Sequence, residues 1–169
     1  LPPITENEVK EIEVKYADSY RIIDQCYSYV ASYALFVEKN DEKTLKYYIK
    51  RNRLIEDFGY TSRYPDIYLS SMFNEIEYHL HFKQSKEAEK MLEKLKNFKT
   101  GTQQLEDRRN YFYYFLGSRY FQQTAKINEG ITLLHELKAL EIHNSGGIGA
   151  AHKKKLYHRA AVFCFIAKE

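Results

Sequence analysis

Three stretches of similar character recur along the chain and constrain its fold more than any other feature. They read DEKTLKYYIKRN, KEAEKMLEKLKN and NEGITLLHELKA, and each follows a short polar turn. Aligned on Thr44, Ala88 and Gly130, they are 44 residues apart (88 − 44) and 42 residues apart (130 − 88). Self-similarity at such an interval is typical of an α-solenoid, in which helix hairpins stack one after another.

Helical spacing of apolar residues, by steps of three and four, extends over almost the whole chain of 169 residues. The chain has only 7 Gly and 3 Pro, which favours long helices over a hairpin-rich sheet. We expect one continuous helix over about residues 5–39, and a break where Gly59 and Pro65 lie. The predicted fold is a single all-α domain over residues 1–169. Its antiparallel hairpins span about 5–58, 66–99 and 104–143, followed by a half repeat over 150–169.

The most aromatic stretch, YFYYFLGSRYF at residues 111–121, is open to a strand or a helix interpretation. A strand would leave Gly117 and Ser118 in its middle unexplained and would leave the leucine-rich segment that follows without a partner. We therefore expect the first helix of the third hairpin here.

The pattern in this hairpin resembles the tetratricopeptide repeat (TPR) family. The first helix of that pattern has a bulky residue, a Leu–Gly pair and an aromatic residue, which are here Tyr113, Leu116, Gly117 and Tyr120. Its second helix has a small residue followed by bulky ones, which are here Gly130, Leu134 and Leu137. A second match comprises Tyr27, Val30, Ala31, Ala34, Thr44 and Tyr48, and a third, limited to a first helix, Tyr157, Ala160, Ala161 and Cys164. The middle hairpin departs from the pattern, because Glu75 and Ile76 stand where a small residue belongs.

The resemblance implies a TPR-like superhelix whose first helices line a groove for a protein or peptide, without catalysis. The groove positions that it implies are Tyr111, Tyr114, Ser118, Phe121, Gln122, Lys155, His158 and Arg159. Lys155 and Arg159 match half of the carboxylate clamp of chaperone-binding TPRs, which suggests an acidic peptide, but Phe115 stands where that clamp has Asn.

The chain ends halfway through a predicted hairpin, so we expect it to be a fragment of a longer protein. The uncovered last helix would also offer an edge to a second copy. By general resemblance, the parent would be a bacterial regulator or sensor. That places the chain in the cytoplasm, or in the periplasm if the parent is anchored in a membrane. In a solenoid, Cys26 and Cys164 would lie too far apart to form a disulfide.

The net charge of +3 is too small to predict nucleic-acid binding by itself. Aromatic residues beside Arg108, Arg109 and Arg119 nevertheless leave a platform for single-stranded RNA as an alternative function. No apolar run approaches the roughly 18 residues that are needed to cross a bilayer, so we expect no membrane insertion.

We expect no metal, cofactor or catalytic site. His79 and His81 are two residues apart, which on a helix directs them to different faces. The GGIGAAHKKK segment at 146–155 lacks the Lys–Ser/Thr ending of a phosphate-binding loop. No nucleophile and base follow a known spacing, although a helical enzyme without a recognisable motif remains an alternative.

Overall fold

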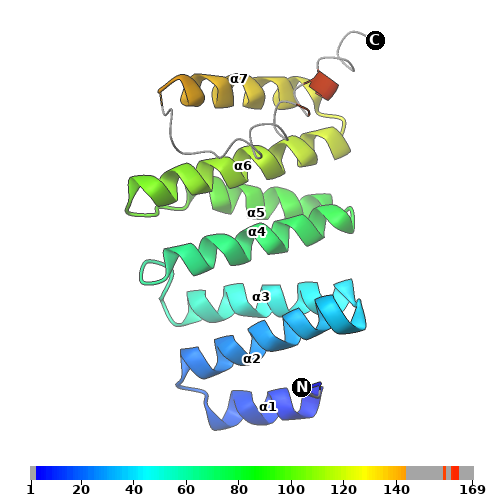
Figure 1. Cartoon of the computed structure of the whole chain (residues 1–169), viewed down its shortest axis with the longest axis vertical. Helices are drawn as coiled ribbons and strands as arrows, with labels where there is room; N and C mark the ends of the chain where they lie inside the picture. The colour runs from blue at the N-terminus through cyan, green and yellow to red at the C-terminus, as the bar shows by residue number, and fades with distance from the viewer. Residues whose placement is uncertain (1–2, 144–157, 159–160, 164–169) are drawn as a thin grey trace. The chain divides into compact units, whose positions relative to one another are not determined.

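The computed structural model describes residues 3–143, 158 and 161–163, and these residues contain no strand (Figure 1). The all-α prediction is confirmed, and α6 (Gln103–Gln123) confirms that the aromatic stretch is helical. The other elements in the described part of the chain are α1 (Glu6–Lys15), α2 (Tyr20–Tyr33), the π-helix η1 (Ala34–Glu38), α3 (Asp41–Asp57), α4 (Pro65–His81), α5 (Ser85–Asn97) and α7 (Ile127–His143).

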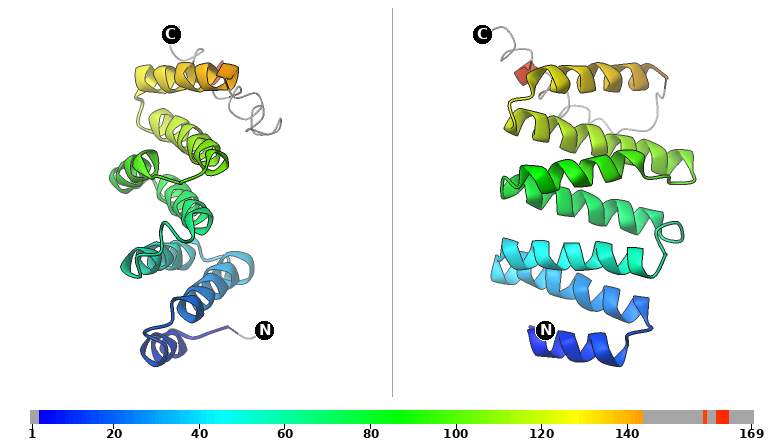
Figure 2. Two further views of the ribbon diagram at one scale, coloured as in Figure 1. Left: turned by 90° about the vertical axis from the view of Figure 1, so that its left-hand side faces the viewer. Right: turned by 180° about the vertical axis from the view of Figure 1, so that it is seen from behind.

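The chain forms two compact units, residues 1–78 and 79–169, and the boundary between them lies within α4. In the first unit, α1 packs on α2, and α2 packs along α3. In the second unit, α6 packs against both α5 and α7. Figures 1 and 2 show these neighbouring helices side by side within each unit. The unit boundary falls inside the hairpin that the sequence predicts over residues 66–99.

Three chain reversals share one backbone device, a residue in the left-handed conformation. These residues are Lys39, Lys83 and Ala125, with φ of 54°, 56° and 56°. They lie five residues before Thr44, Ala88 and Gly130, all of which are buried. The interval of 44 and then 42 residues in the sequence therefore reappears as three equivalent turns, each of which leads into a helix with a small or compact residue at its packed face.

The second and third turns are closed by the same type of backbone hydrogen bond. The amide of Gln84 donates to the carbonyl of His79 at 2.8 Å, and that of Lys126 donates to Phe121 at 2.9 Å, which is the bond of a Schellman motif. In the first turn the amide of Asn40 donates to the carbonyl of Ala34 at 2.9 Å, so the acceptor lies six residues before the donor and not five. The π-helix η1 accounts for this extra residue, because its wider turn inserts one position before the same reversal.

The expected continuous helix over residues 5–39 is wrong, because residues 16–19 separate α1 from α2. Asp18 and Ser19 favour turns through their short polar side chains, and the amide of Ser19 closes the turn on the carbonyl of Tyr16 at 2.8 Å. The predicted hairpin over 5–58 thus consists of α1 followed by the hairpin of α2 and α3.

An aromatic cluster holds the loop between α3 and α4 against the start of α2. The ring of Tyr20 stacks on Tyr64 with centroids 5.6 Å apart and meets the edge of Tyr60 at 5.2 Å. Phe58 lies 5.9 Å from the same ring. Gly59 leaves α3 with φ of 67°, as predicted, and so allows the chain to fold back over Tyr20.

Two glycines of the third hairpin mark close approaches between helices. A Cβ atom on Gly117 would lie 3.1 Å from Cδ2 of Leu133, which belongs to α7, so α6 and α7 approach closely there. A Cβ atom on Gly130 would instead lie 2.5 Å from the ring of Phe163. Gly130 therefore leaves room for the ring of Phe163, which comes from a later segment of the chain and packs on α7.

The middle hairpin departs from the repeat pattern at a buried polar pair. Glu75 of α4, only 6% exposed, accepts a hydrogen bond from the side-chain amide of Asn52 on α3, which is 3% exposed. A buried carboxylate is costly without such a partner. Glu75 occupies a position at which the repeat pattern has a small residue, and Asn52 on the neighbouring helix provides its hydrogen-bond partner.

The repeated left-handed turn predicts opposite effects for one substitution at two places. Lys83→Gly relieves the strain of a Cβ atom at positive φ, and we expect it to raise the free energy of unfolding by about 1 kcal/mol. The control Lys90→Gly, at an exposed position inside α5, should lower it by about 1 kcal/mol. Urea unfolding monitored by circular dichroism measures both, and a destabilised Lys83→Gly variant would contradict the turn geometry.

Candidate functional site

The groove positions predicted from the sequence differ in their exposure. Ser118 is fully buried, and its hydroxyl donates to the carbonyl of Phe115 within α6 at 2.8 Å. Tyr114 is buried against Leu133, and this burial, together with the charge of Glu136, raises the pKa of its hydroxyl to about 12. Neither side chain offers surface to a ligand in the described structure.

The remaining predicted positions have surface or lie outside the described residues. Tyr111 and Phe121 are half-buried, whereas Gln122 and His158 are exposed. The ring of Tyr111 stacks on Phe115 with centroids 5.8 Å apart. Lys155 and Arg159, the two cations of the implied clamp, lie outside the described residues, as do Cys164 and the GGIGAAHKKK segment. A groove on α6 therefore stays a prediction.

The structure reveals a different concave site, between α1 and the start of α2. It is a groove of about 510 Å³, and its apolar lining consists of Ile4, Ile12, Tyr16 and Ile22. Three charged side chains, Glu8, Glu11 and Lys15, complete the lining. We call this site the α1 groove. An apolar floor with a few placed charges is the usual composition of a binding site.

Helical spacing places Glu8, Ile12 and Lys15 on one face of α1. Ile4 precedes the N-cap residue Thr5, and Tyr16 is the C-cap residue, so these two side chains lie at the two ends of α1. A capping box fixes the start of the helix. The Glu8 carboxylate accepts the amide of Thr5 at 2.7 Å, and the amide of Glu8 donates to the Thr5 hydroxyl at 3.3 Å. The backbone hydrogen bond from Thr5 also lowers the pKa of Glu8.

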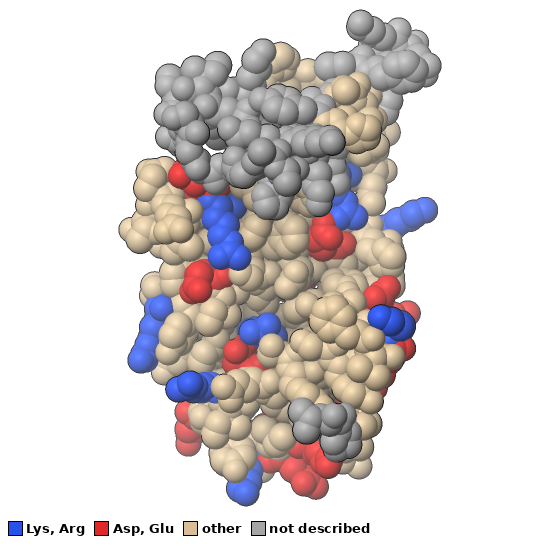
Figure 3. All heavy atoms as spheres, viewed as in Figure 1, with Lys and Arg blue, Asp and Glu red and all other residues tan. Residues whose placement is uncertain are grey.

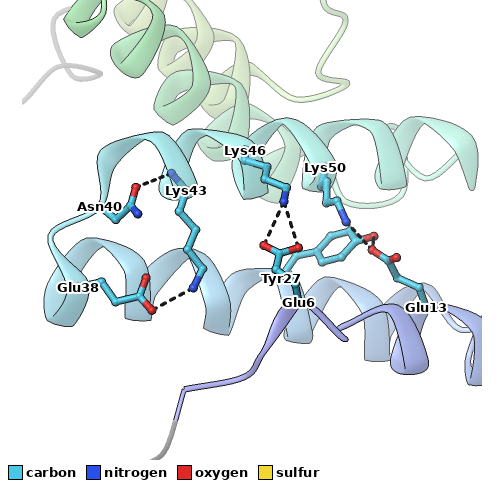
Figure 4. A network of polar contacts seen from close by, with 8 residues as sticks. All are labelled: Glu6, Glu13, Tyr27, Glu38, Asn40, Lys43, Lys46 and Lys50. Carbon is cyan, nitrogen blue, oxygen red and sulfur yellow. Dashed lines mark hydrogen bonds and ion pairs between the residues drawn. The ribbon is translucent and has the colours of Figure 1, made fainter. Parts of the chain in front are cut away.

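The opposite face of α1 is attached to the hairpin of α2 and α3 by charged contacts (Figure 4). Lys46 of α3 contacts both carboxylate oxygens of Glu6 at 3.0 Å. The ammonium of Lys50 and the hydroxyl of Tyr27 each donate to one oxygen of Glu13 at 2.6 Å. Glu6 and Glu13 are seven residues apart on α1, and Lys46 and Lys50 are four apart on α3. The two ion pairs therefore connect α1 to α3 near both ends of α1.

Apolar and cation–π contacts support the same attachment. Val9 is the single side chain of α1 that is buried, and it packs into the core of the first unit. The ammonium of Lys50 lies 5.1 Å from the ring centroid of Tyr27 and 5.4 Å from that of Tyr47. Such a cation is stabilised by two ring faces as well as by the Glu13 carboxylate.

The attachment shifts the pKa of both carboxyl groups. Hydrogen bonding from Lys46 lowers the pKa of Glu6, and this outweighs the partial burial of that carboxyl group. Burial raises the pKa of Glu13, but the hydrogen bonds from Lys50 and Tyr27 together outweigh it, so its pKa also lies below the ordinary value. Both groups are therefore held in the charged form by the folded structure.

The charges of the described residues are interspersed on the face seen in Figure 3. Lysines and arginines lie next to acidic side chains within each unit, and the described residues show no continuous basic stripe there. A basic stripe is the usual feature of a nucleic-acid-binding surface.

The two histidines of the HxH pair occupy different surroundings, as helical spacing predicts. His79 is 5% exposed, and its Nδ1 lies 2.7 Å from the side-chain oxygen of Gln84. His81 is exposed, and its ring lies 5.1 Å from that of Phe82. Among the described residues, no three His, Cys, Asp or Glu side chains are grouped closely enough to hold a metal ion.

No protein-family model matches the chain, and neither a curated protein nor a solved structure matches it. The resemblance to TPR proteins consequently rests on the residues named above and stays a prediction. Within the described ranges, none of the helices is both long enough and apolar enough to span a bilayer.

Sequence reasoning missed the α1 groove because it treated residues 5–39 as one helix. On that assumption, Tyr16 belongs to the same apolar stripe as Tyr20 and Ile23. The break at residues 16–19 separates them, so that Tyr16 lines the groove while Tyr20 lies in the aromatic cluster. The Asp18–Ser19 pair, a turn signal, was the available indication.

The attachment of α1 should weaken in acid. A carboxyl group with a lowered pKa contributes stability that is complete above its unfolded value, 4.5 for Glu13, and that disappears as the pH falls through the folded value. Glu13→Gln should therefore cost about 1 kcal/mol of unfolding free energy at neutral pH and show a smaller loss between neutral pH and about pH 3 than the wild type. Denaturant titrations across this range measure both effects.

Glu11→Gln is the matched control, because Glu11 lies on the groove side of α1 and makes no ion pair in the described part of the chain. Its pH profile should follow that of the wild type. Equal profiles for Glu13→Gln and the wild type would contradict the role assigned to Glu13.

Proposed function

We propose that this chain is a non-catalytic module that binds a protein or peptide segment. The observation that carries the proposal is the threefold recurrence of one helix reversal, at Lys39, Lys83 and Ala125, each followed by a helix with a buried small or compact residue. Helix-hairpin repeats of this kind present extended surfaces that proteins use for recognition.

The α1 groove adds a site of suitable composition. Its lining is mostly apolar, with Glu8, Glu11 and Lys15 as charged groups, and one of its apolar residues, Ile22, is 38% exposed. Apolar surface of this kind on a helical scaffold suits the apolar side of a peptide better than a small polar metabolite.

Following the resemblance to TPR proteins, the module would serve as the sensory or scaffolding region of a larger regulatory protein, in bacteria by the same resemblance. The groove on α6 that this resemblance implies, with Tyr111, Phe121 and Gln122 at its described positions, is a second surface for such a role.

Selection of peptides from a random display library on the immobilised chain tests this function. We expect families of related sequences whose synthetic versions bind with one-to-one stoichiometry in calorimetry and a Kd of about 1 μM, equivalent to about −8 kcal/mol. Scrambled versions of the same peptides are the control and should not bind.

Two results would contradict the proposal. One is the absence of any enriched sequence relative to an unrelated helical protein of similar size. The other is saturable, salt-sensitive binding of single-stranded RNA in a gel shift without any peptide binding, which would favour the RNA platform.

A further inference from the structure

The two sides of α1 differ in how their carboxylates are used. Glu6 and Glu13 face α3, where Lys46 and Lys50 neutralise them. Glu8 and Glu11 line the α1 groove instead. Glu8 is held by Thr5 without a cation, and no cation pairs with Glu11 in the described structure. The groove side of α1 thus retains negative charge next to exposed apolar surface.

The one cation of the lining does not neutralise this pair. The ammonium of Lys15 lies 5.3 Å from the ring centroid of Tyr16, at the far end of the groove from the capping box. Lys15 lies in the last turn of α1, while the carboxylates lie along its first two turns. Ile12 and Ile22 provide the apolar surface beside them.

We propose that the α1 groove binds an amphipathic helix with a basic flank, in which Leu or Ile residues cover Ile12 and Ile22 and Lys or Arg residues face Glu8 and Glu11. This inference rests on the proposed function and specifies its site and partner class. The helix α1 has 10 residues, roughly 15 Å in length, which corresponds to a partner of about three turns.

Charge selects this occupant over a second copy of the chain. A twofold contact through the same face would place Glu11 opposite Glu11 or Glu8 at the centre of apolar surface, which is unfavourable. A partner with cations opposite Glu8 and Glu11 is instead attracted by these carboxylates, and the attraction also raises the association rate.

Fluorescence anisotropy with two labelled synthetic peptides tests the proposal on the full chain. One peptide repeats Leu and Lys at helical spacing over about four turns, and the other carries Glu in place of every Lys. We expect the basic peptide to bind with saturation and the acidic peptide to bind at least about tenfold more weakly, with the difference shrinking as salt rises from about 0.05 M to 0.5 M.

Variants of the chain locate the site. Glu11→Lys should weaken binding of the basic peptide about tenfold, and Ile22→Gln should weaken binding of both peptides. The matched control is Glu42→Lys, an exposed position on α3 outside the groove, which should leave both affinities unchanged. Circular dichroism and thermal unfolding check that each variant is folded, and the exposed position of Glu11 makes that variant the most informative one.

Equal affinity for the two peptides, no binding of the basic peptide, or the same affinity in Glu11→Lys as in Glu42→Lys would overturn the proposal. Dimerisation of the free chain that Glu11→Lys abolishes would favour the second copy and also overturn it. Failure of the α1 groove proposal can be distinguished from failure of the proposed function. If peptides are enriched from the random library but their binding is insensitive to Glu11→Lys, the chain binds peptides at another surface.

Discussion

Reversal of the chain through a single left-handed residue is the constraint on which the helix pairing depends. At Lys39, Lys83 and Ala125 the backbone turns back, and the amide that follows each residue closes the preceding helix. None of the three is glycine, so each turn stores strain that the packing of the following helix has to offset. The residues five positions after each turn, Thr44, Ala88 and Gly130, are small or compact and buried, so a neighbouring segment can pack closely on the following helix.

A second constraint acts on α1, which buries Val9, packs Ile12 partly against the same core and is also attached through charges. Glu6 and Glu13 occupy the side that faces α3, while the part of Ile12 that remains exposed lines the groove, together with Ile4 and Tyr16 at the two ends of the helix. The same arrangement that fixes α1 therefore creates the α1 groove. Attachment by ion pairs also connects the integrity of this groove to pH and ionic strength.

The helical class and the hairpin turns could be predicted, because apolar spacing and turn residues are local signals. The split between α1 and α2 was missed, since Asp18–Ser19 interrupts an apolar stripe without Gly or Pro. The α1 groove and the Asn52–Glu75 pair depend on which faces meet in three dimensions. Spacing indicates that a small residue is needed at position 130, but it does not show that the ring of Phe163 packs there.

Backbone NMR assignment in solution tests the recurring reversal most directly. We expect helical chemical shifts on both sides of Lys39, Lys83 and Ala125, and shifts and couplings of positive φ at these three residues. Helical shifts should also continue without interruption through residues 111–121. Negative φ at two of the three reversals, or extended-chain shifts across the aromatic stretch, would contradict the recurring helix reversal.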